Sequence, residues 1–396
     1  MSEWKKVKLG ELCSFINGGA WSDKEYAPEG IPVLKVTNCK NSGFSLSELS
    51  YLPYSLEQKY IQNKLQLNDV IIATVGSHPN LVNSSAGRSV IVNSFVEGFY
   101  LNQNAVCIRT KNESVLNQLF LGYYSKYYLF QHYIQMRGKG AANQMRIAIS
   151  AIKEYPMPLP PLSVQHHIAT ILSRYDSLIE NYQKQIKLLE EAAQRLYKEW
   201  FIDLHFPGYE NTKIIDGVPE GWEKKPVDTI YSIKYGKNLS TKLISENGKF
   251  PVYGANGVIG YYDKANCNEQ VVLITSRGNG SGDVLMTYHK DAFITNNSFI
   301  VSPIEDYSYC QLPFTYQFLK NANFRAVRTG AAQPQLTNQS IHTVDVVLPS
   351  KDVIIDYCDK ASYNNKKIIL LKNQIRLLTE ARDRLLPKLM GGEIAV

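Results

Sequence analysis

Apolar residues recur every seven positions along residues 164–201, in two interleaved series. This a and d spacing, sustained over about five heptads, is typical of a coiled-coil helix. No Gly or Pro interrupts it, so the pattern predicts one helix of about 57 Å. The alternative is a long amphipathic helix that packs on its own domain. The residues expected to form this part of the seam are Leu172, Tyr175, Ile179, Tyr182, Ile186, Leu189 and Leu196.

The same stripe returns near the C-terminus, at Ile368, Leu371, Ile375, Leu378 and Leu385. The stretch that begins at Ile186 aligns with the one that begins at Ile375, at an offset of 189 residues. Arg382 places one charge on the second stripe, where such a residue usually sets register or partner. Two long helices with matching stripes in one chain are most simply explained if they bury those stripes against each other.

The segments before the two helices also repeat. Short β-like runs such as 31–36, 69–75 and 89–92 are bounded by Gly, Asn and Ser clusters, and residues 116–135 have helical spacing. Trp222 and its neighbours match the start at Trp4, and Gly330-Ala-Ala-Gln-Pro-Gln matches Gly140-Ala-Ala-Asn-Gln-Met. The offset falls from 218 at the tryptophans to 190 at Gly330 and then holds at 189 along the helices. Loops therefore accumulated insertions, whereas one inserted residue would turn a helical seam away from its partner.

These observations predict an α/β (α+β) protein with four segments. The expected division is 1–160 for the first globular domain, 161–205 for the central helix, 206–350 for the second globular domain and 351–396 for the C-terminal helix. An apolar content of 44% and a charged content of 20% describe an ordinary globular chain. The six cysteines are scattered, without a C-x-x-C pair, as expected for reduced core thiols of a cytoplasmic protein. We expect no membrane span and no secretory signal.

No catalytic motif stands out. Gly278-Asn-Gly-Ser-Gly282 lacks the Lys-Ser/Thr of a nucleotide-binding loop and precedes a strand-like run, so we expect a hairpin turn. His166 and His167 are adjacent and point to different helix faces, which argues against a shared metal ion. The chain has no H-E-x-x-H, no G-x-S-x-G and no paired Cys/His spacing. We therefore predict no metal site and no cofactor in this chain.

Two polar loops are the best candidates for function. Each combines basic side chains, which can grip guanine or phosphate, with amides, which can hydrogen-bond adenine. A net charge of +7 is compatible with nucleic acid without requiring it. The alternative is that such loops are simply solvated by water; their recurrence in both domains favours DNA contact. The predicted DNA-binding residues are Arg137, Lys139, Asn143, Gln144 and Arg146 in the first domain, and Arg277, Asn279, Arg325, Arg328, Gln333 and Gln335 in the second.

With these motifs in order and repeated, the chain resembles the DNA specificity subunits of type I restriction–modification systems. The resemblance covers nearly the whole chain and rests on the opening at Trp4, the Gly140 and Gly330 motifs, Pro158-Leu-Pro-Pro-Leu162 with Gln165 just after it, and the duplicated helices. The second copy departs from the pattern, because Ile354 occupies the place that corresponds to Gln165.

The resemblance implies two target-recognition domains, each reading half of a bipartite site in double-stranded DNA, separated by two antiparallel coiled-coil helices with internal pseudo-twofold symmetry. It also implies docking of two methyltransferase subunits, in which S-adenosylmethionine is bound, and recruitment of nuclease and translocase subunits. The chain itself would be non-catalytic. Two other classes stay open: a coiled-coil adaptor that recognises protein, and a stand-alone DNA-modifying enzyme.

Overall fold

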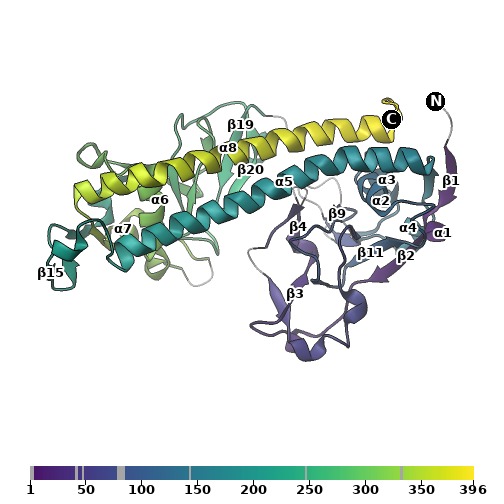
Figure 1. Ribbon diagram of the computed structural model, residues 1–396, viewed down its shortest axis with the longest axis horizontal. Helices are drawn as coiled ribbons and strands as arrows, with labels where there is room; N and C mark the ends of the chain where they lie inside the picture. The colour runs from purple at the N-terminus through teal and green to yellow at the C-terminus, as the bar shows by residue number, and fades with distance from the viewer. Residues whose placement is uncertain are drawn as a thin grey trace. The chain divides into compact units, whose positions relative to one another are not determined.

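The computed structural model describes residues 4–40, 43–46, 49–77, 85–141, 144–245, 248–330 and 333–396. The chain forms two compact units (Figure 1). The first unit joins Met1–Ile179 with Arg376–Val396, and the second is the continuous stretch Glu180–Ile375. Both boundaries fall inside long helices, so each unit contains one globular part and a portion of each helix.

The two predicted long helices are present. Helix α5 spans Leu162–Tyr197 and continues into a wider π-helical turn at Lys198–Ile202, and α8 spans Lys351–Met390. Ser163 lies inside the first turn of α5, which begins at Leu162. The one proline of α8, Pro387, lies in its last turn.

Within each unit the two helices run antiparallel and share a core. In the first unit Ile168 and Leu172 of α5 pack in the same cluster as Leu386 and Leu389 of α8. In the second unit Ile186 packs with Ile368 and Leu371. None of the twelve seam residues is exposed. Five are buried (Leu172, Ile179, Ile186, Ile368 and Leu371), and seven are partly buried (Tyr175, Tyr182, Leu189, Leu196, Ile375, Leu378 and Leu385).

The charged residue that the sequence places on the stripe, Arg382, is paired. The guanidinium of Arg382, 11% exposed, lies 2.5 Å from Asp176 and 2.7 Å from Asp383. Burial alone would lower the pKa of Arg382, but the two carboxylates more than offset it and raise that pKa. Asp176 also accepts a hydrogen bond from the hydroxyl of Tyr123 at 2.7 Å. This polar network ties both long helices to α2 (Gln118–Ser125) in the first unit.

The second unit has its own charged contact beside the stripe. The ammonium of Lys372 lies 3.3 Å from Glu190 and 3.4 Å from the centre of the Tyr288 ring. Burial lowers the pKa of Lys372, while Glu190 opposes that shift. The contact joins α5, α8 and the segment that follows β22 (Val284–Met286).

The first unit is built on an antiparallel four-stranded sheet in the order β2-β11-β7-β9. A second sheet, β10-β3-β6, pairs β10 and β3 in parallel. The strands are β1 Lys5–Lys8, β2 Cys13–Asn17, β3 Ile31–Leu34, β4 Cys39–Lys40, β5 Gly43–Phe44, β6 Ser50–Leu52, β7 Val70–Ala73, β9 Ser89–Ile91, β10 Tyr100–Leu101, β11 Ala105–Thr110 and β14 Pro156–Leu159, with helices α1 Leu9–Leu12, α3 Tyr128–Gln135 and α4 Ile149–Lys153.

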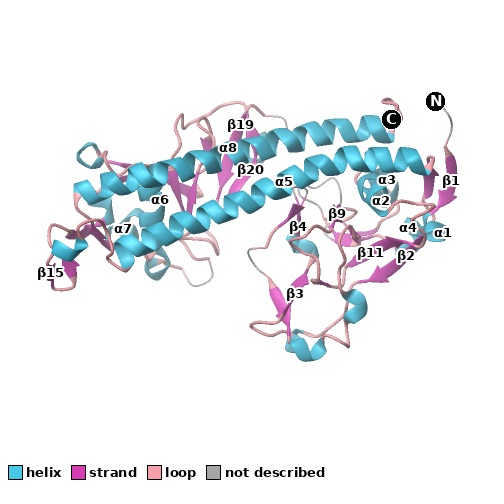
Figure 2. Ribbon diagram, viewed as in Figure 1, coloured by secondary structure: helices cyan, strands magenta, loops and turns pink. Residues whose placement is uncertain are grey.

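The second unit repeats this plan. Its four-stranded sheet has the order β18-β24-β21-β22, and β19 pairs in parallel with β23 as β3 does with β10. β1 pairs with β14, the strand before α5, and β17 pairs in the same way with β25, the strand before α8. The elements are β15 Ile214–Ile215, β16 Val218–Pro219, β17 Glu223–Pro226, β18 Tyr231–Tyr235, β19 Phe250–Gly254, β20 Gly257–Tyr262, β21 Val272–Thr275, β22 Val284–Met286, β23 Phe293–Ile294, β24 Ser298–Pro303, α6 Leu312–Asn321, α7 Asn338–His342 and β25 Asp345–Leu348. Figure 2 shows this mixture of strands and helices.

Residues 116–135 form two helices, although their spacing suggested a single one. The side chain of Asn117 caps α2 by accepting a hydrogen bond from the amide of Phe120. Tyr127 then takes an extended conformation before α3 begins. Its ring is buried against Tyr124 and Tyr128, at centroid distances of 5.7 and 4.8 Å. Packing of aromatic side chains therefore accompanies a bend that periodicity alone does not reveal.

Gln165 is a fully buried amide at the start of α5. Its oxygen accepts from the amide of Asn117 at 2.9 Å, and its nitrogen donates to the carbonyls of Val115 and Pro160 at 3.0 and 2.9 Å. These bonds join the helix to the segment that precedes α2. At the corresponding place in the second unit, Ile354 is buried among apolar side chains. The amide therefore stabilises the first unit only.

We expect Gln165→Ala to lower the free energy of unfolding of the first unit by about 2–4 kcal/mol, because it removes three hydrogen bonds of a buried amide, one of them to the buried carbonyl of Pro160. Chemical denaturation of the purified chain measures the change. Gln183→Ala, at an exposed position of the same helix, is the control and should alter stability by less than about 0.5 kcal/mol. Equal stability of the two variants would contradict this role of Gln165.

Candidate nucleic-acid interface

The Gly-rich stretch of the first unit forms a β-hairpin. Strands β12 (Lys139–Ala141) and β13 (Gln144–Arg146) pair with each other, and β13 also pairs with β8 (Val75–Gly76). Gly140 has a φ of +131°, and a Cβ there would lie 2.2 Å from the carbonyl oxygen of Gln144. Glycine therefore permits the close approach of the two strands. Asn143 lies outside the residues that the structure describes.

Side chains of this hairpin alternate between the core and the surface. Met145 is buried in the core of the first unit, whereas Gln144 and Arg146 are exposed. Lys139 is also exposed and lies directly opposite Arg146. Within the described part of the chain, the side chains of Lys139, Gln144 and Arg146 make no hydrogen bond or ion pair. They are available to an external ligand.

Arg137, by contrast, is held by α3, the helix that precedes it. Its guanidinium stacks on the ring of Tyr133, 3.4 Å from the ring centre, and donates to the carbonyl oxygen of Tyr133 at 3.0 Å. The side chain is exposed but oriented. A bound phosphate could still reach its free N–H groups.

The second unit builds a similar edge with fewer strand residues. Thr329 and Gln335 exchange two backbone hydrogen bonds of 2.9 Å. Gln335 also lies opposite Arg277. Two further bonds flank that pair, from the amide of Gly278 to Pro334 at 2.9 Å and from that of Leu336 to Ser276 at 2.8 Å. Arg277 and Gln335 are therefore a non-hydrogen-bonded pair, the closer of the two antiparallel geometries.

The other predicted residues of the second unit fall into two groups. Arg325 forms an ion pair with Asp283, with its Nε 2.9 Å from the carboxylate. Arg328 donates to the carbonyl oxygens of Arg325 and Asn279 at 3.0 and 3.4 Å. These two arginines hold the loop between β21 and β22. The side chains of Asn279, Gln333 and Gln335 are exposed.

Strand pairing refines the alignment of the two repeats by one residue. In the first unit the amide of Ile147 donates to Thr74 beside the Arg146 and Val75 pair, and in the second that of Leu336 donates to Ser276 beside Gln335 and Arg277. Gln335 therefore corresponds to Arg146, and not to Met145 as the motifs suggested. The physical reason is burial, because Leu336 fills the core position that Ile147 has.

The loop Gly278–Gly282 is a hairpin connection, as expected. It joins β21 to the antiparallel strand β22, and no helix follows it. Gly278 and Gly282 both have positive φ, at +85° and +87°. The strand-to-helix context that a phosphate-binding loop requires is absent from this described segment.

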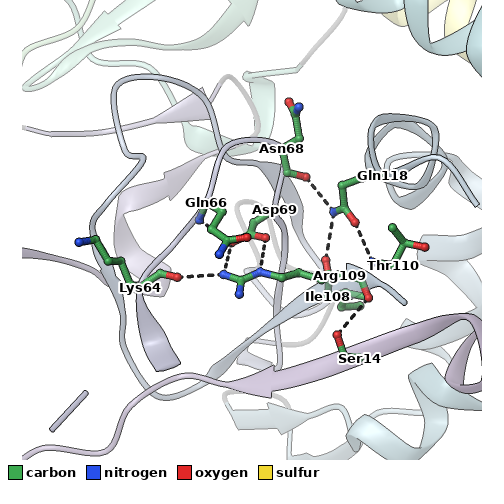
Figure 3. Close-up of polar contacts among 9 residues, drawn as sticks. All are labelled: Ser14, Lys64, Gln66, Asn68, Asp69, Ile108, Arg109, Thr110 and Gln118. Atoms are coloured by element: carbon green, nitrogen blue, oxygen red, sulfur yellow. Dashed lines mark hydrogen bonds and ion pairs between the residues drawn. The ribbon is translucent and has the colours of Figure 1, made fainter. Parts of the chain in front are cut away.

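A partly buried ion pair stands at the start of β7, the strand that leads into β8, and sequence reasoning missed it. The carboxylate of Asp69, 3% exposed, accepts from the Nε and one terminal nitrogen of Arg109 at 2.6 and 2.7 Å (Figure 3). This hydrogen bonding raises the pKa of Arg109. Gln118 completes the cluster by bonding the backbone of Asn68, Ile108 and Thr110. The only sign of this ion pair in the sequence is the position of Asp69, directly before the apolar strand β7.

The described residues do not gather metal ligands. They contain no group of three His, Cys, Asp or Glu side chains placed to hold a metal ion. All six cysteines are free and buried. Burial raises the pKa of Cys13, Cys39 and Cys310 to about 12, which keeps these thiols protonated. No helix in the described part is long and apolar enough to span a membrane.

Known proteins with similar sequences include specificity subunits of type I restriction enzymes. The MjaIX type I restriction enzyme specificity subunit of Methanocaldococcus jannaschii is 28% identical over 274 residues, which cover 62% of each chain. The MjaVIII specificity subunit of the same organism is 26% identical over 252 residues, covering 62% of this chain and 53% of the relative. The chain thus spans less than two thirds of the length of these relatives.

A solved structure supports the same fold. The crystal structure of the type I restriction-modification system S subunit from M. genitalium aligns with a TM-score of 0.54 at 21% identity, covering 98% of this chain and 96% of that one. The family model described as the type I restriction modification DNA specificity domain matches residues 1–191 and 219–375. These two matches take in most of the chain, which therefore belongs to the type I restriction modification DNA specificity domain family.

Proposed function

We propose that this chain is the DNA-reading, non-catalytic subunit of a type I restriction–modification complex. Each unit would recognise one half of a bipartite site in double-stranded DNA. The observation that carries the proposal is the double family match over residues 1–191 and 219–375. In addition, each unit carries an exposed polar edge of three paired segments. The assignment of 1–160 and 206–350 as the two target-recognition domains is part of this proposal.

The shape and chemistry of the two edges suit the major groove. Paired strands lie about 4.8 Å apart, so three of them span about 10 Å. The major groove is about 12 Å wide and admits a two-stranded β-ribbon, so two adjacent strands of each edge can enter it. The free side chains of Lys139, Gln144 and Arg146 supply donors for phosphates and base edges. Arg277 and Gln335 would do the same in the second unit.

The long helices would set the spacing between the two half-sites. A helix of 36 residues such as α5 is about 54 Å long. One turn of B-DNA is about 34–36 Å, so that length corresponds to about one and a half turns. The proposal requires both target-recognition domains to face the same DNA duplex.

The partners in this proposal are two methyltransferase subunits, with nuclease and translocase subunits added in the full complex. The partner methyltransferases would bind S-adenosylmethionine and modify adenine in the cytoplasm. Two apolar side chains support twofold docking. Leu188 on α5 is 64% exposed, and Leu377 on α8, its counterpart at the offset of 189 residues, is 54% exposed. A single exposed leucine is common on a protein surface, but its recurrence at equivalent places on both helices fits a partner that binds twice.

A salt titration tests the DNA-binding proposal. In the assembled complex, Lys139→Ala should reduce the slope of log affinity against log salt by about one, because one phosphate contact is lost. Equilibrium binding to duplex DNA at several salt concentrations measures it. Lys24→Ala, an exposed lysine elsewhere in the first unit, is the control and should leave the slope unchanged. If Lys139→Ala has the same slope as the wild type, Lys139 does not contact a DNA phosphate.

Stoichiometry tests the docking proposal. Leu188→Glu and Leu377→Glu should each reduce the bound methyltransferase subunits from two to one, and the double variant should bind none, because a charge replaces an apolar contact. Native mass spectrometry of the complex counts the subunits. Gln183→Glu adds the same charge at an exposed polar position and should retain both. If the double variant still binds two subunits, these leucines are not the docking sites.

A further inference from the structure

Each unit presents one row of three side chains that runs across its three paired segments. In the first unit the row is Lys139, Arg146 and Val75, as the pairing of β12 with β13 and of β13 with β8 requires. In the second unit it is Thr329, Gln335 and Arg277. Residues directly opposite each other in antiparallel strands place their side chains on the same face. We call each set the cross-strand row.

The geometry points to the cross-strand row as the element that selects bases, an inference that rests on the proposed function. We infer in particular that its outer position, Val75 in the first unit and Arg277 in the second, determines which base is accepted there. The two units would thus read different half-sites with the same backbone arrangement. A change of one side chain at this position would change the sequence that is recognised.

Arg277 combines a fixed backbone with a free side chain. Its neighbours Ser276 and Gly278 are hydrogen-bonded to Leu336 and Pro334, one on each side. Its guanidinium makes no hydrogen bond or ion pair within the described residues and is exposed. A residue that contacts bases needs such a combination. The ordered backbone limits the entropy lost on binding, and the N–H donors of the guanidinium remain free to bond a base.

The chemistry of the second row favours a purine-rich half-site. An arginine can donate two parallel hydrogen bonds to O6 and N7 of guanine, and a glutamine can bond N6 and N7 of adenine. Because Arg277 and Gln335 form the closer type of antiparallel pair, their Cα atoms are about 4.5 Å apart. Their side chains can therefore reach neighbouring bases. We assign guanine to Arg277 and adenine to Gln335.

The first row has a different chemistry at the same outer position. Val75 is partly exposed and has no donor or acceptor in its side chain. An apolar side chain in the major groove contacts the methyl group of thymine. Arg146, at the centre of the row, is free and exposed and supplies the guanine contact. The first unit would therefore accept thymine where the second requires guanine.

The anchored arginines have a separate role. The charge of Arg325 is already balanced by Asp283, and Arg328 bonds two backbone carbonyls. Both hold the loop that carries Arg277, so they are positioning residues. Removing one of them should weaken binding to all sequences alike, without altering base preference.

The test is a selection of bound DNA from duplexes with randomised half-sites, using the complete complex with its methyltransferase subunits. Arg277→Val should abolish the preference for guanine at one position of one half-site and reduce affinity for the selected sequence by about 10- to 100-fold. Arg277→Lys should retain part of that preference, because lysine also bonds guanine. Val75→Arg should add a guanine preference to the other half-site. Arg325→Ala serves as the control for uniform weakening.

The outcomes separate the two proposals. If the wild-type complex selects no sequence, the proposed function itself fails. If the wild-type complex selects a bipartite site but Arg277→Val weakens all sequences equally, or keeps the guanine preference, the inference is overturned. The position is exposed, so thermal unfolding of Arg277→Val should match that of the wild type.

Discussion

The structure depends on the apolar stripe along α5 and α8, because both units take part of their core from it. In the first unit the stripe closes one side of a cluster that also contains Phe120 and Tyr123, and in the second it meets Tyr288. A single inserted residue would rotate all following side chains by about 100° and move the stripe out of both cores. This constraint explains why the offset between the repeats varies in the globular parts and stays constant along the helices.

At the exposed edges the backbone is also constrained, whereas the outward side chains can vary. In both units the edge is held by backbone hydrogen bonds and by glycine at a close approach, and these contacts place few demands on outward side chains. The inward residues, Met145 and Leu336, are fixed by burial. Specificity can therefore change by substitution on the outer face, without loss of the fold.

Much of this architecture could be predicted from the sequence, because long periodic patterns carry a strong signal. The two helices, the repeated strands and the hairpin turn at Gly278–Gly282 follow from spacing and from glycine. The break between α2 and α3 could not, since it depends on the tertiary packing of Tyr127. The ion pair of Asp69 and Arg109 joins residues far apart in sequence, so no local pattern announces it. The alignment of Gln335 with Arg146 required the observed strand pairing. The residues of the polar edges could be predicted from the sequence. The structure was needed to show that Arg137 is held by Tyr133 and Arg325 by Asp283.

The first unit is made of segments from both ends of the chain, and this affects the order in which the two units can fold during biosynthesis. That unit requires Arg376–Val396, whereas the second is complete once Ile375 has been made. Chains leave the ribosome N-terminus first, at about 5–20 residues per second, and domains generally fold as units. The globular part that is translated first must therefore wait for the last helical turns before its core can close, and the part translated second can finish folding earlier. Truncation by even a few turns at the C-terminus would damage the N-terminal unit and spare the other.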